Sequence, residues 1–154
     1  MKISSLLVFF IVYAGSFIFS IFSNKRPFWY RRLKKSSLTP PGHVIGIVWS
    51  ILYLLIAFSV SMIHYRHGFC DKTKRFYSLF GINYLFNQAF GFLFFTCRSR
   101  LLGMLDTIVV AITSIWLTFL AKPLSKVSSY LLIPYALWTT FASYLSYKVY
   151  VLNR

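Results

Sequence analysis

The chain has 154 residues, of which 58% are hydrophobic and 12% are charged, and its formal net charge is +15. A soluble domain has about 25% charged residues, so this composition offers too little polar surface to cover a water-exposed globule. The 17 Lys and Arg residues outnumber 2 acidic ones, which favours an anionic partner such as nucleic acid or anionic lipid. The basic residues lie mostly in short gaps between apolar runs, so we expect a lipid bilayer as the partner and no nucleic acid.

Five apolar stretches are long enough to cross a bilayer, which requires about 20 apolar residues. Because lipid offers the backbone no hydrogen-bond partners, each stretch is expected to be a helix. We therefore predict an all-α membrane protein, a bundle of five transmembrane helices that forms a single domain over residues 1–154. The expected helices span residues 4–23, 44–63, 76–95, 101–121 and 127–149.

The first apolar stretch is interpreted as a retained helix rather than as a secretory signal. Its apolar part is longer than the 7–15 residues of a typical signal, and no clear A-x-A cleavage site follows it. The next expected helix follows Thr39-Pro40-Pro41. We expect Thr39 to be its N-cap and proline to occupy its first position, where the missing N–H is not needed.

An odd number of spans places the two termini on opposite sides of the membrane. One side then holds Lys2, Arg66, Lys72, Lys74, Arg75, Lys122 and Lys126. The other side holds Lys25, Arg26, Arg31, Arg32, Lys34, Lys35, Arg98, Arg100, Lys148 and Arg154. Because the second set is larger, the positive-inside rule predicts a cytoplasmic first loop and C-terminus.

Several short motifs follow one another in a fixed order from residue 29 to residue 147. The motifs are, in order, Trp29-Tyr30, Lys35, Pro40-Pro41, Val44-Ile45-Gly46, Val48-Trp49, Leu52-Tyr53, Asn87, Phe94-Phe95, Asp106, Leu131-Leu132-Ile133-Pro134-Tyr135, Trp138, Phe141 and Ala142. This ordered set resembles the TspO/MBR family, that of the translocator protein or peripheral-type benzodiazepine receptor. The resemblance covers four of the five expected helices and agrees with the helix count.

The resemblance implies an integral membrane receptor or translocator built as a five-helix bundle, usually a homodimer. Its pocket would open on the side of the first loop and bind flat hydrophobic ligands such as porphyrins (tetrapyrroles). Sterols and benzodiazepine-like drugs are further ligands of family members, and a porphyrin or haem-like molecule would be a ligand rather than a required cofactor. Animal members lie in the mitochondrial outer membrane and bacterial members in the cell membrane. The expected location is therefore the mitochondrial outer membrane if the chain is eukaryotic or acts in a eukaryotic cell, and the cell membrane if it is bacterial.

The same resemblance supplies the candidate site residues. The expected ligand-binding residues are Trp49, Tyr53, Asn87, Phe90, Tyr135, Trp138, Ala142 and Ser146. The expected loop and pocket entrance comprise Trp29, Lys35, Pro40 and Pro41.

Helical spacing is consistent with this set, because Trp49 and Tyr53 share one helix face and Trp138 and Ala142 share another. Flat aromatic walls with a few polar handles suit a porphyrin. Spacing alone favours the packing of one helix against the next as the role of these residues, and the resemblance reverses that preference for Trp49, Asn87 and Trp138.

Asp106 is the one acidic residue within an apolar run. A carboxylate there is costly unless it is paired or close to the interface. It therefore has either a structural role, as a partner of an Arg or a backbone group, or a functional one.

The sequence lacks the residue sets that paired-acid or catalytic-triad chemistry requires. No Ser-His-Asp set, glycine-rich phosphate loop or carboxylate pair appears in the sequence, so we predict no catalytic residue, no metal site and no enzyme. One alternative is a structural or adaptor membrane protein without ligand transport, because Ser146 and Val151 depart from the sterol motif of animal members. Another is weak porphyrin degradation, by analogy with some bacterial relatives in which tryptophans are implicated.

Overall fold

The computed structural model describes residues 2–22 and 27–154, and in this part of the chain every regular element is a helix. The elements are α1 Ile3–Phe22, α2 Pro27–Arg32, α3 Gly42–His67, α4 Asp71–Phe90, the π-helix η1 Gly91–Thr96, α5 Arg100–Ala121 and α6 Lys126–Leu152. Residue 23 of the first expected helix, Lys25 and Arg26 lie outside the described residues.

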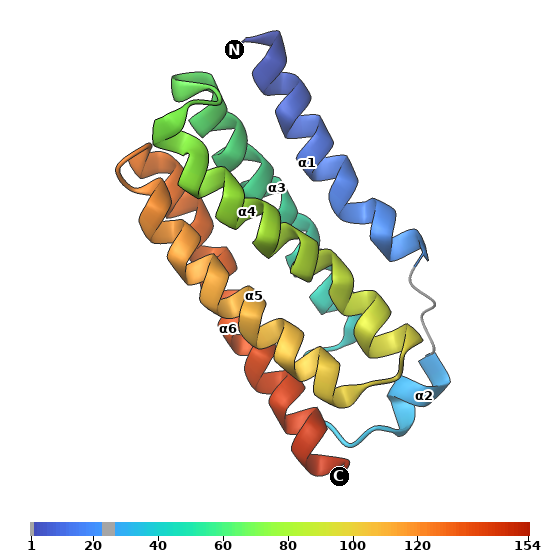
Figure 1. The fold of residues 1–154 in the computed structure, drawn as a ribbon. Helices are drawn as coiled ribbons and strands as arrows, with labels where there is room; N and C mark the ends of the chain where they lie inside the picture. Colours follow the sequence, from blue (N-terminus) through green and yellow to red (C-terminus); the bar gives the residue numbers. More distant parts are fainter. Residues whose placement is uncertain (1, 23–26) are drawn as a thin grey trace.

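The long helices run up and down in a bundle, with the two termini at opposite ends (Figure 1). α5 packs along α6 and also against α4, while α3 packs against α6. α1 lies at the outside of the bundle against α3, and the short helix α2 lies at the end where α4 finishes and α5 begins (Figure 1).

The turns between helices follow from a few capping residues. Ser99 and Ser125 each accept a hydrogen bond from the backbone N–H three residues ahead, and so cap α5 and α6. Gly68 ends α3 at φ 64°, which glycine adopts without steric cost. The expected start of α3 was wrong by about two residues: Pro41 is the N-cap, at φ −57° and ψ 148°, and the helix begins at Gly42.

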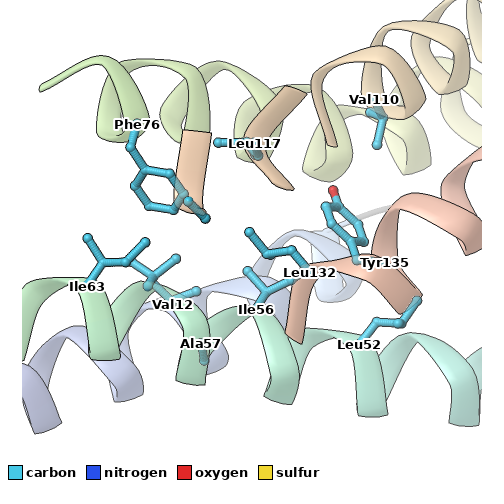
Figure 2. Packing of buried hydrophobic residues seen from close by; sticks show 12 residues of the cluster. Val12, Leu52, Ile56, Ala57, Ile63, Phe76, Val110, Leu117, Leu132 and Tyr135 are labelled. Atoms are coloured by element: carbon cyan, nitrogen blue, oxygen red, sulfur yellow. The ribbon is translucent and has the colours of Figure 1, made fainter. Parts of the chain in front are cut away.

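The larger of the two buried apolar clusters draws its residues from α1, α3, α4, α5 and α6 (Figure 2). Ile63, Phe76 and Leu117 interlock there, with exposed fractions of at most 1%. Leu132 and Tyr135 extend the core along α6 towards the middle of the bundle (Figure 2). This cluster therefore holds the five long helices together.

Two local elements differ from the sequence-based expectation. The first loop contains α2, and the range expected as one regular helix over 76–95 changes to π-helix at Gly91. Within the described residues, α3 and α5 are long and apolar enough to cross a membrane, and a shorter apolar helical run covers Ile3–Ile18. α4 and α6 carry more polar residues, several of which bond inside the bundle.

Candidate ligand-binding site

A cavity of about 630 Å³ lies at the first-loop end of the bundle. Its walls come from α1, α3, α4, η1, α5, α6 and the first loop. The lining residues are Ser16, Phe17, Tyr30, Thr39, Gly42, Ile45, Gly46, Trp49, Ser50, Tyr53, Asn87, Gln88, Phe90, Gly91, Phe94, Phe95, Asp106, Thr107, Val110, Trp138, Thr139, Ala142, Leu145, Ser146 and Val149.

Aromatic rings form much of the cavity wall. The rings of Trp49 and Tyr53 have centroids 5.5 Å apart and are tilted by 33°. Phe90, the last residue of α4, and Phe94 in η1 stack with centroids 5.2 Å apart and an interplanar angle of 11°. Such paired rings present flat apolar faces, which match the faces of a polycyclic ligand.

Small side chains leave the space that these rings enclose. A Cβ atom added at Gly42 or Gly46 would meet no atom within 4 Å. Ala142 and Ser146 occupy successive turns on the opposite wall. The cavity thus depends on glycine, alanine and serine at positions where larger residues would fill it.

A chain of hydrogen bonds crosses the floor of the cavity. The Tyr53 hydroxyl donates to Asn87 Oδ1 over 3.0 Å, and Asn87 Nδ2 donates to the Tyr135 hydroxyl over 2.8 Å. Tyr135 in turn donates to Asn83 Oδ1 over 2.8 Å, and Asn83 Nδ2 donates to Thr113 over 2.7 Å. These groups are paired with one another, which fixes the positions of α3, α4, α5 and α6.

Other polar groups of the lining have no such partner. Within the described residues, neither carboxyl oxygen of Asp106 has a hydrogen-bond partner, and the same holds for Trp138 Nε1 and Thr39 Oγ1. Asp106 is 3% exposed. The partnership with Arg or a backbone group that the sequence left open is thus not formed in the described part of the chain.

The first loop covers this end of the bundle. Leu33 is buried in a second apolar cluster with Phe94 and Val149, and Trp29 packs on Phe94 with ring centroids 5.3 Å apart. The loop is also tied to the C-terminus: Lys34 N donates to Asn153 Oδ1 over 2.9 Å, and Asn153 Nδ2 donates to Lys34 O over 2.8 Å.

Lys35 and Tyr30 join the cover to the cavity. The Lys35 ammonium lies 4.4 Å from the centroid of the Tyr30 ring, and Tyr30 itself lines the cavity. Partial burial lowers the pKa of Lys35 and raises the pKa of Tyr30, because burial disfavours the charged form of each group. A cation over an aromatic face at this distance is an attractive contact.

The profile of the TspO/MBR family matches residues 7–152. The chain belongs to the TspO/MBR family. It is 45% identical over 153 residues to the tryptophan-rich protein TspO of Bacillus cereus, covering 99% of both chains. It is 39% identical over 155 residues to an uncharacterized membrane protein, YtaB, of Bacillus subtilis, covering 98% of this chain and 97% of the other. With the translocator protein of Homo sapiens it shares 28% identity over 123 residues, 79% of this chain and 73% of the human one.

TspO/MBR proteins are membrane proteins, and the two apolar helices α3 and α5 agree with that assignment. Of the candidate ligand-binding residues, Trp49, Tyr53, Asn87, Phe90, Trp138, Ala142 and Ser146 line the cavity of this family member. Tyr135 lies behind the lining, 1% exposed, and holds Asn87 instead.

The four candidate entrance residues lie next to the cavity lining rather than in it. Trp29 and Lys35 pack against lining residues, whereas Thr39 and Gly42, on either side of Pro40 and Pro41, line the cavity.

Sequence reasoning left several lining residues out of the TspO/MBR site. Tyr30 and the Phe94-Phe95 pair stood within quoted motifs, and Asp106 was singled out as a lone buried acid. The positions of Ser16 and Phe17 on α1 had no signal, because the resemblance begins after that helix. Ile45 and Gly46 also stood within a quoted motif, Val44-Ile45-Gly46, but were not selected as site residues.

Proposed function

We propose that this TspO/MBR protein is an integral membrane receptor or translocator that binds flat hydrophobic ligands, such as porphyrins, in the cavity at its first-loop end. The observation that carries the proposal is the 630 Å³ cavity with paired aromatic walls, since ligand pockets have about 300–1,000 Å³ and mostly apolar linings. Sterols and benzodiazepine-like drugs are further ligand classes within the proposal.

We propose that five helices, α1, α3, α4 with η1, α5 and α6, cross the bilayer. The shortest of these, α1 and α4, have 20 residues each, which at the usual rise spans about 30 Å. Large apolar side chains on the outside of the bundle, such as Ile112, Phe119 and Leu137, support a lipid environment. The mitochondrial outer membrane and a bacterial cell membrane are both compatible with this arrangement.

The basic first loop has a direct role in this proposal. Arg31 and Arg32 are exposed at the end of α2, next to the cover of the cavity. Their guanidinium groups would pair with the carboxylates of a porphyrin whose ring enters the apolar space. The loop is thus both a topological anchor and a charged rim for an amphipathic ligand.

Titration with protoporphyrin tests the proposal. The wild-type protein in nanodiscs should give a saturable change in porphyrin absorbance, whereas empty nanodiscs of the same lipid should give only linear partitioning. Identical curves for the two samples would refute a binding site. The proposal assigns binding and not catalysis to the cavity, so illumination should degrade protoporphyrin no faster with the protein than with empty nanodiscs. It also includes a homodimer, for which cross-linking in membranes should yield a species of two chains.

A further inference from the structure

Among the described residues that line the cavity, three have an unpaired polar atom: Thr39 in the first loop, and Asp106 and Trp138 on helices. The groups of Asp106 and Trp138 have opposite hydrogen-bonding character. Asp106, on α5, lines the cavity with two acceptor oxygens that lack a partner among the described residues. Trp138, on α6, lines it with an Nε1–H donor that likewise lacks one in the described part of the chain. The neighbouring polar groups are satisfied locally: Ser50 donates to Gly46 O, and Thr139 donates to Tyr135 O.

The unpaired state of Asp106 is energetically unfavourable. A polar group buried without a hydrogen bond is destabilising, and a carboxyl inside a membrane-spanning helix more so. The other acidic residue of the chain, Asp71, is exposed at the start of α4 and so avoids this cost. An apolar side chain at position 106 would serve packing better, so the carboxyl calls for a partner that enters the cavity.

We propose that Asp106 makes the cavity selective for flat polycyclic ligands that carry an N–H group on their edge, with Trp138 Nε1 donating to an acceptor such as a ring carbonyl. This inference rests on the proposed function, because it requires the ligand to occupy this cavity. A donor on the ligand edge removes the desolvation penalty of the carboxyl oxygens. A ligand of the same shape without the donor leaves those oxygens unpaired and so binds more weakly.

The required donor defines a ligand class beyond porphyrins. The N–H groups of a porphyrin lie at the centre of its ring, so a porphyrin has no N–H donor on its edge. Acridone is an example of a ligand with an N–H on one edge and a carbonyl on the opposite edge. Such a ligand offers a donor for Asp106 and an acceptor for Trp138 Nε1. Its ring faces would lie against aromatic residues such as Trp49 and Phe90.

Acridone and xanthone form a matched pair of probes, because they share the same three-ring shape and the same carbonyl. Acridone carries a ring N–H at the position where xanthone carries a ring oxygen. Equilibrium binding to the wild-type protein in nanodiscs, corrected for partitioning into empty nanodiscs, should favour acridone. A hydrogen bond to a carboxyl corresponds to a preference of about tenfold to a hundredfold. Equal affinities for the two probes would overturn the inference.

Substitution of Asp106 tests whether the preference for acridone depends on this side chain. Asp106→Leu should remove it by weakening acridone binding and leaving xanthone binding unchanged or stronger. Asp71→Leu is the matched control, since it removes the exposed acid outside the cavity, and it should keep the wild-type preference. If Asp106→Leu does not fold, Asp106→Asn replaces it as the test, because a neutral acceptor should reduce the preference for acridone. An unchanged preference in a folded Asp106 variant would overturn the inference.

The outcomes separate the inference from the proposed function. If both probes bind equally and protoporphyrin displaces them, the cavity binds flat ligands but Asp106 does not select among them. If neither probe nor protoporphyrin binds the wild-type protein, the proposed function fails and the inference fails with it.

Discussion

Asn87 uses its side-chain amide to connect two tyrosines. Its Oδ1 accepts from Tyr53, and its Nδ2 donates to Tyr135. The amide that the resemblance assigns to the ligand therefore also holds the wall of the cavity in place. Asp106 and Trp138, in contrast, have free polar atoms within the described residues, and their side chains remain available for a ligand.

Gly46 tests whether the open volume is needed for binding. Gly46→Leu places a side chain where a Cβ atom meets no other atom within 4 Å, so the variant should fold while its cavity becomes smaller. Protoporphyrin affinity, measured by absorbance titration, should fall by at least about tenfold, the equivalent of 1.4 kcal/mol. Gly81→Leu is the control, because Gly81 is also unhindered but lies outside the cavity lining. Unchanged affinity in a folded Gly46→Leu protein would contradict the assignment.

Spacing and motif order could predict most of these positions, but not their partners. Trp49 and Tyr53, four residues apart, were expected on one face, and both line the cavity. Tyr135 lies three residues before Trp138 and so on the same side of α6. Its side chain is nevertheless buried in the bundle core and is 1% exposed. Helical periodicity gives the face of a residue, whereas its depth depends on how the neighbouring helices pack.

The π-helix η1 changes the direction of the chain beside the cavity. The backbone N–H of Cys97 donates to Phe92 O over 2.9 Å, five residues back, which is the π-helical pattern. Phe94 and Phe95, both in η1, thereby meet the first loop, where Tyr30 packs on each of them. The apolar pattern of residues 76–95 predicted one continuous helix, because a change from α to π geometry leaves hydrophobicity unaltered.

Gly103 allows α5 to lie close to η1. A Cβ atom at this position would be 2.5 Å from Phe94 Cδ2, so Gly103→Ala must displace the ring or the helix. Overpacking of this kind costs about 1–3 kcal/mol. We expect a lower melting temperature in detergent for Gly103→Ala, and an unchanged or higher one for the control Gly81→Ala, whose added methyl group meets open space. Equal melting temperatures for the two variants would show that the close contact is not rigid.

The molecule as a whole combines an apolar core with a cavity at its first-loop end. The core around Ile63, Phe76 and Leu117 holds the helices together, and the first-loop end carries the cavity and its basic cover. Recurrent apolar stretches predicted the long helices, whose observed bounds overlap the expected ranges. The short helix α2 could not be predicted from apolar length, since its six residues end in Arg31 and Arg32.

The arrangement of the ends leads to a topology prediction. The first loop is tied to Asn153 at the C-terminus, and the N-terminus lies at the opposite end (Figure 1). In a protein whose two exposed cysteines, Cys70 and Cys97, are replaced by serine, Ser36→Cys and Arg154→Cys should react with an impermeant maleimide from the cytoplasmic side of sealed membranes. Lys122→Cys, in the turn before α6, should react from the other side. Reaction of Ser36→Cys and Arg154→Cys from different sides would refute the five-span arrangement.

The most direct test of the cavity as a ligand site is the dissociation constant of protoporphyrin for Trp138→Ala, measured beside that for Trp116→Ala. Trp138 lines the cavity, whereas Trp116 lies on α5 with 57% of its surface exposed. Loss of one aromatic wall should cost about 1–3 kcal/mol, so Trp138→Ala should raise the dissociation constant about five- to 150-fold, and Trp116→Ala should leave it unchanged. If Trp138→Ala folds normally, as a thermal melt would show, and binds protoporphyrin as tightly as the parent, Trp138 is a packing residue and the cavity is not the binding site.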